Sequence, residues 1–149
     1  MKTLLALLCI VSLASPTFAG PDHDHGPRTQ PGPNGGRILA KFEPHVEFLV
    51  TPDRRVKLTF LDGAGKPVPA ANQIASLITG DRMAPTRLTF VPAAGALLSE
   101  QTLPEGSAWP VVVEIRGSAE SKPTRDKFNL DLAVCSGCSR PEYACTCGH

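Results

Sequence analysis

The chain has 149 residues, with 15 Lys and Arg against 14 Asp and Glu and a formal net charge of +1. This length fits one domain. The balanced charge, with no run of Lys or Arg, argues against nucleic acid or an anionic membrane surface as a partner. The 15 prolines and 13 glycines indicate many turns and irregular segments.

Residues 1–19 are organised like a secretory signal peptide. A positive start at Lys2 precedes an apolar run, which ends at Pro16 and the small-x-small sequence closing at Ala19. The apolar run is shorter than the roughly 20 residues of a membrane-spanning helix. We therefore expect cleavage after Ala19, a periplasmic or secreted protein, and no stable membrane insertion. Cys9 leaves with the signal peptide.

Residues 20–36 are rich in proline, glycine and polar side chains. Prolines exclude a helix here, and the segment has too few apolar side chains to bury, so we expect a flexible, disordered leader. It includes His23 and His25, each preceded by an aspartate, and an extended chain would place both imidazoles on one side. Such a pair binds Zn²⁺ or Cu²⁺ weakly and reversibly, or it belongs to a polar linker with incidental histidines.

Residues 37–134 show short apolar alternations with a period of two, the pattern of half-buried strands. Turn sequences such as Asp-Gly-Ala-Gly-Lys-Pro at 62–67 separate them. The pattern predicts an all-β domain, an antiparallel immunoglobulin-like β-sandwich of about seven or eight strands. The clear strand candidates are 46–50, 56–60, 87–90, 111–115 and 128–132, and the weaker ones are 37–41, 73–78 and 96–99.

Catalytic motifs are missing from the sequence. There is no G-x-S-x-G, no phosphate-binding loop and no H-E-x-x-H. His45 follows Pro44 at the start of a predicted strand and is expected at a sheet edge or in solvent. Trp109 is expected to be a packing residue. We therefore do not expect an enzyme.

Residues 135–149 form a cysteine-rich tail beyond the last predicted strand. The first two cysteines are spaced C-x-x-C, which lets two thiolates bind one ion from a tight turn, and a C-x-C pair follows. Four sulfurs, or three with the terminal imidazole, can surround Zn²⁺ tetrahedrally, and the same soft ligands suit Cu⁺. The candidate ligands are Cys135, Cys138, Cys145, Cys147 and His149.

Two alternatives to metal binding remain for the tail. An exported protein meets an oxidising compartment, and the crossed disulfides Cys135–Cys147 and Cys138–Cys145 are less strained than a Cys145–Cys147 ring. The C-x-x-C pair is also the spacing of thiol–disulfide exchange proteins, although the strand-then-helix context that activates such a thiol is missing.

A family resemblance lies in two segments near the start of the domain. They read Gly-Pro-Asn-Gly-Gly-Arg-Ile at 32–38 and Pro-His-Val-Glu-Phe at 44–48. These resemble the start of small periplasmic β-domains that accompany, or are fused to, the adaptor (membrane fusion) subunits of heavy-metal efflux pumps. A strand and turn at 61–68 looks like those of immunoglobulin-like exported domains. The resemblance covers roughly residues 20–70 and does not include the cysteine tail.

This resemblance implies a β-sandwich that handles Zn²⁺, Cu⁺ or a similar ion, with an efflux adaptor or transporter subunit as partner. Together with the tail, it predicts an exported protein that sequesters or presents a metal ion alongside heavy-metal efflux. The alternatives are a non-catalytic immunoglobulin-like structural or interaction module with a disulfide-stapled tail, and a thiol–disulfide exchange protein using Cys135 and Cys138.

Overall fold

The computed structural model describes residues 30–147, which contain nine strands and one 3-10 turn. The predicted all-β antiparallel fold is confirmed, and each of the eight predicted strands is present. The ninth, β4, has two residues and pairs with β3. The elements are β1 Arg37–Leu39, β2 His45–Val50, β3 Val56–Leu61, β4 Pro67–Val68, β5 Ile74–Gly80, β6 Pro85–Ala93, β7 Ala96–Ser99, β8 Ala108–Arg116, β9 Thr124–Asp131 and η1 Glu142–Ala144.

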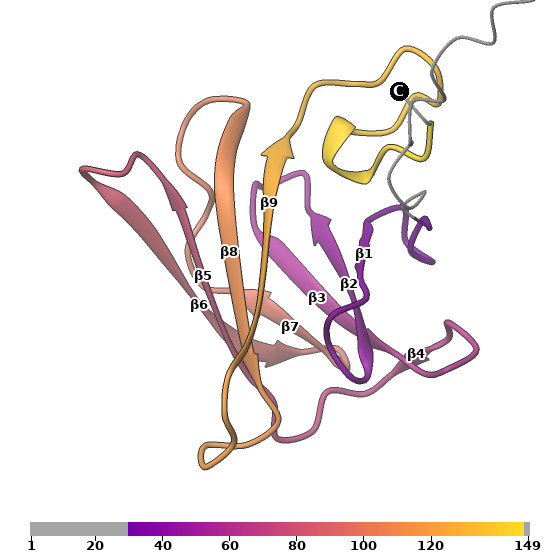
Figure 1. Ribbon diagram of the computed structural model, residues 1–149, viewed down its shortest axis with the longest axis vertical. Coiled ribbons are helices and arrows are strands. Elements are labelled where there is room, and N and C mark those ends of the chain that lie inside the picture. Colours follow the sequence, from indigo (N-terminus) through magenta and orange to yellow (C-terminus); the bar gives the residue numbers. More distant parts are fainter. Residues whose placement is uncertain (1–29, 148–149) are drawn as a thin grey trace, which may run out of the picture.

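The strands form one antiparallel path in the order β1-β2-β3-β7-β6-β5-β8-β9, which folds over on itself into two layers (Figure 1). Strand β6 joins the layers because its two halves have different partners. Residues 85–89 pair with β5, and residues 90–93 pair with β7. One layer therefore holds β1, β2, β3 and β7, and the other holds β5, β8 and β9.

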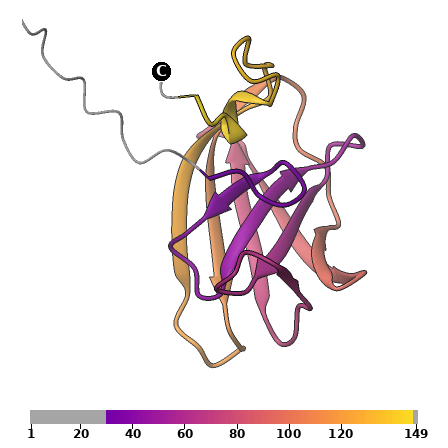
Figure 2. The same cartoon turned by 90° about the vertical axis from the view of Figure 1, so that its right-hand side faces the viewer.

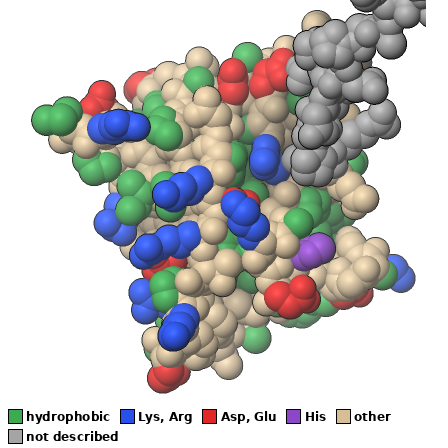
Figure 3. Space-filling view, viewed as in Figure 1, with side chains coloured by type: hydrophobic (Ala, Val, Ile, Leu, Met, Phe, Trp, Pro, Cys, Tyr) green, Lys and Arg blue, Asp and Glu red, His purple; other side chains and the backbone are tan. Residues whose placement is uncertain are grey.

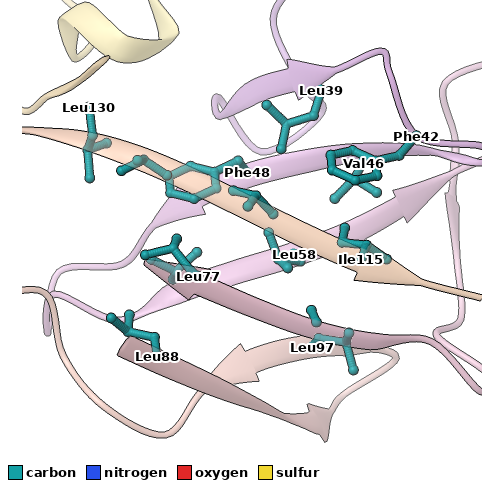
Figure 4. Packing of buried hydrophobic residues seen from close by; sticks show 14 of the residues in the cluster. Leu39, Phe42, Val46, Phe48, Leu58, Leu77, Leu88, Leu97, Ile115 and Leu130 are labelled. Carbon is teal, nitrogen blue, oxygen red and sulfur yellow. The ribbon is translucent and has the colours of Figure 1, made fainter. Parts of the chain in front are cut away.

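The core fills the space between these layers, where the apolar members of each alternating strand meet. Phe48 and Leu58 from one layer face Leu77 and Leu88 from the other, and all four are fully buried (Figure 4). Burial of each large apolar side chain contributes about 1.5–3 kcal/mol before conformational entropy is subtracted. The alternation in the sequence thus correctly identified most of the core.

The two end strands, β1 and β9, have no strand partner on one side among the described residues. Side chains join them instead, and we call this junction the β1–β9 seam. Lys41 Nζ lies 2.7 Å from Asp126 Oδ1. The Arg37 guanidinium lies 4.8 Å from the centre of the Phe128 ring, and that ring packs edge-on against Phe48 at 5.1 Å. Side-chain contacts thus replace a hydrogen-bonded ladder at the seam.

The folded unit begins before Arg37, because residues 30–36 form a turn that covers the outer face of β2. Alternation places Glu47 on this outer face, yet the turn buries the side chain completely. Its Oε1 accepts hydrogen bonds from the backbone N–H groups of Asn34 (2.8 Å) and Gly36 (2.9 Å), and its Oε2 accepts one from Asn34 Nδ2 (2.6 Å). A buried carboxylate is stable here because the turn supplies its donors.

Glycine is required where this turn meets β2. A Cβ on Gly32 would collide with the Glu47 carboxylate, and a Cβ on Gly36 would collide with the backbone oxygen of Phe48. The glycine-rich sequence of the leader is therefore a packing requirement, since its backbone must approach the strand closely.

Replacing Glu47 with alanine is expected to lower the free energy of unfolding by about 2–4 kcal/mol, because the buried Gly36 N–H and the partly buried Asn34 N–H lose their acceptor. Urea denaturation measures the change. Glu43→Ala is the matched control: Glu43 is exposed, and its loss is expected to change stability by less than about 0.5 kcal/mol. Equal effects of the two substitutions would show that the carboxylate does not hold the turn.

Candidate metal centre

After β9 the chain doubles back in a short loop that carries the first cysteine pair. Ala133 O accepts a hydrogen bond from Glu142 N at 2.8 Å, which closes the base of the loop. At its tip, Cys135 O accepts one from Ser139 N at 2.9 Å. These backbone hydrogen bonds hold the residues around Cys138 in a tight turn, as the C-x-x-C spacing predicted.

The 3-10 turn η1 then returns the chain, so that the second pair meets the first. Cys145 N donates to Glu142 O at 3.1 Å, which closes this turn. A Cβ on Gly137 would lie 2.9 Å from Cys147 Sγ, closer than real Cβ contacts allow. Gly137 is therefore needed because the second pair approaches its backbone, rather than for an unusual φ angle.

The four cysteine sulfurs form one compact cluster. All lie within 4.8 Å of one another. Cys145 Sγ lies 3.3 Å from Cys135 Sγ and 3.7 Å from Cys138 Sγ, and the Cys135 and Cys147 sulfurs are 4.0 Å apart. A tetrahedral ion with bonds of about 2.3 Å to sulfur places its ligands about 3.8 Å apart. No disulfide joins the four, and the cluster has the dimensions of a tetrathiolate metal site.

The electrostatics of the cluster distinguish its thiols. Hydrogen bonds from the backbone N–H groups of Thr146 and Arg140 lower the pKa of Cys138 to about 6. Removal from water, together with the neighbouring sulfurs, raises the pKa of Cys145 to about 12. The pKa of Cys147 is raised as well, first by its hydrogen bond with Cys138. One thiolate thus opposes ionisation of its neighbours, and a cation among the sulfurs relieves this opposition.

Tyr143, between the two cysteine pairs, attaches the cluster to the sandwich. Its side chain is 3% exposed, and its ring packs edge-on against Phe48 with 5.8 Å between centres. Its hydroxyl oxygen accepts a hydrogen bond from Val50 N at 3.0 Å, and its carbonyl oxygen accepts one from Arg37 Nη1 at 3.4 Å. Burial and the charge of Glu47 raise the pKa of Tyr143. Figures 1 and 2 show the tail at one end of the sandwich.

The structure brings together the four cysteines that the sequence singled out. Within residues 30–147 they are the only group of three or more His, Cys, Asp or Glu side chains whose ligand atoms are close enough to hold one ion. Three other predicted ligands, His23, His25 and His149, lie outside the described residues, as does the predicted signal peptide 1–19. The described part of the chain has no helix long and apolar enough to cross a membrane.

Two further predicted residues are placed as expected. His45 is exposed at the start of β2, and the space-filling view shows a histidine on the surface (Figure 3). It lines a shallow hollow of about 420 Å³ and belongs to no metal group. Trp109 packs partly buried against the core, under the Arg54 guanidinium at 5.5 Å.

The sequence reasoning missed Tyr143. The only signal was a single tyrosine among small and polar residues, placed between two cysteine pairs. A lone aromatic side chain has no periodicity, so nothing in the pattern indicated that it enters the core.

Comparisons with protein-family models, with curated proteins and with solved structures gave no match. The resemblance of residues 20–70 to efflux-associated domains therefore stays a hypothesis.

Because its pKa is lowered, Cys138 is expected to be the first cysteine that iodoacetamide alkylates in chelator-treated protein. The thiolate is the reacting form, so its rate is expected to rise through about pH 6 and level off above it, while Cys145 reacts only in alkaline solution. Peptide mass spectrometry after timed labelling measures the order. Uniform labelling of all four cysteines at pH 7 would contradict this ranking.

Proposed function

We propose that this protein is exported and binds one metal ion, Zn²⁺, through Cys135, Cys138, Cys145 and Cys147, and that it sequesters or presents the ion alongside a heavy-metal efflux system. The observation that carries the proposal is the approach of four sulfurs from two cysteine pairs to within 4.8 Å of one another.

Zn²⁺ is favoured among soft ions by geometry and charge. The sulfur separations of 3.3, 3.7 and 4.0 Å scatter around the edge of a zinc–thiolate tetrahedron, about 3.8 Å. A divalent ion also offsets the charge of four thiolates better than a monovalent one. Cu⁺ is the second candidate, because thiolates are its preferred ligands as well.

Accessibility supports a binding role in which the ion can be exchanged. Cys135 is buried, whereas Cys138, Cys145 and Cys147 are each partly exposed. Four protein ligands fill a tetrahedral shell and leave no position for a substrate, which favours ion binding over catalysis. Incoming thiols can reach the three partly exposed sulfurs, as sequestration followed by transfer requires.

Export and the efflux partner rest on the sequence. Residues 1–19 carry the order of charge, apolar run and cleavage site that directs secretion. The efflux adaptor or transporter subunit comes from the resemblance of the segments 32–38 and 44–48. The second of these contains Glu47, whose carboxylate binds the turn formed by the first.

Mature protein is expected to bind one Zn²⁺ per chain. Replacing Cys145 with serine is expected to weaken binding at least about 100-fold, because a thiolate ligand is lost and the remaining three no longer close the shell. Elemental analysis gives the stoichiometry, and competition with a chromophoric chelator gives the affinity. Ser136→Ala, at an exposed residue of the same loop, is the control and is expected to bind like the wild type.

Two other results would each replace the proposal. Metal-free protein in which every thiol is oxidised in pairs would support the disulfide-stapled structural module. Turnover of a dithiol substrate, lost in Cys135→Ser and Cys138→Ser variants, would support thiol–disulfide exchange.

The exported protein is expected to begin at Gly20. N-terminal sequencing of protein recovered from the periplasm or the culture medium tests this expectation. Ala19→Arg is expected to prevent processing, because signal peptidase needs a small residue before the cut. Recovery of soluble protein that still begins at Met1 would contradict the export assignment.

A further inference from the structure

We propose that the metal ion controls closure of the β1–β9 seam, because the two cysteine pairs hold Tyr143 in that seam from both sides. This inference rests on the proposed metal binding and adds a consequence to it. The bound ion would then stabilise the closed seam, so that binding or loss of the ion changes the structure of one end of the sandwich.

The seam depends on Tyr143 for several contacts at once. Its ring makes a T-shaped contact with the ring of Phe48, which in turn packs against Phe128 of β9. Its hydroxyl satisfies the Val50 N–H at the end of β2, and its carbonyl receives the Arg37 guanidinium from β1. Tyr143 thus contacts the β1 and β2 side of the seam directly and reaches Phe128 of β9 through Phe48, while the η1 turn that carries it lies against both β1 and β9.

The position of Tyr143 depends in turn on the tail around it. The regular structure of the tail consists of the 3-10 turn Glu142–Ala144 and an isolated backbone bridge between Val134 and Pro141, and both are too short to be stable alone in water. Cys138 precedes this turn and Cys145 ends it, so an ion bound to both closes the chain into a loop around Tyr143. Closing a loop through a metal removes much of the freedom of the unbound tail.

Loss of the ion is expected to weaken this anchor and release Tyr143. Phe48 would then lose its ring contact with Tyr143, the Val50 N–H would meet solvent, and Arg37 would lose its carbonyl partner. Coupling between two sites is reciprocal, so the docked tyrosine must strengthen metal binding by the same factor by which the metal strengthens docking. This reciprocity provides two independent measurements.

The first measurement is amide hydrogen exchange of the full mature protein, loaded with Zn²⁺ or treated with a chelator. The Val50 amide is expected to exchange at least about tenfold faster without the metal, whereas amides of β8 exchange at the same rate in both states. If Zn²⁺ binds but the Val50 exchange rate does not change, the proposal that the ion controls seam closure is wrong, and metal binding stands. If no Zn²⁺ binds, both proposals fail.

The second measurement is Zn²⁺ affinity in Tyr143 variants. Tyr143→Ala is expected to weaken binding about tenfold, whereas Tyr143→Phe, which keeps the ring against Phe48, is expected to lose about threefold or less. Leu88→Ala is the control. It removes a fully buried side chain of β6, away from the tail, and is expected to destabilise the fold with Zn²⁺ affinity unchanged. Equal Zn²⁺ affinity of Tyr143→Ala and wild type would overturn the inference.

Discussion

Four thiol groups within 4.8 Å of one another cannot all ionise unless a cation lies among them. Here the fold already produces the conflict, since the pKa of Cys138 is lowered to about 6 while that of Cys145 is raised to about 12. Two backbone N–H groups, of Thr146 and Arg140, donate to Cys138, whereas removal from water and the neighbouring sulfurs dominate at Cys145. Attraction between the thiolates and a soft ion resolves the conflict, and the proposed activity depends on this interaction.

The same tail completes the sandwich. A sheet that folds over on itself leaves two end strands, and here β1 and β9 meet through Lys41, Asp126, Arg37 and Phe128. Tyr143 adds a buried ring and two hydrogen bonds at that junction. The cysteine cluster and the β1–β9 seam are therefore adjacent. An ion bound by the cluster would therefore affect the packing at this end of the sandwich.

The strands could be predicted because each has one face on the core and the other facing outward. Apolar and polar side chains therefore alternate along them, and this alternation is visible in the sequence. The two-residue strand β4 is too short to show a period. The burial of Glu47 could not be predicted, because alternation identifies the side of a strand on which a residue lies and does not show what covers that side. Its burial comes from the turn at 30–36, whose prolines and glycines indicated a flexible segment.

The cysteine cluster could be predicted because C-x-x-C and C-x-C spacings fix local geometry, whereas Tyr143 required knowledge of the tertiary fold. The most direct test of the central claim is X-ray absorption at the metal edge, on protein purified from its native compartment. The account predicts a zinc edge with four sulfur neighbours at about 2.3 Å. A first shell of nitrogen and oxygen alone, or protein without metal whose cysteines are joined in pairs, would contradict it.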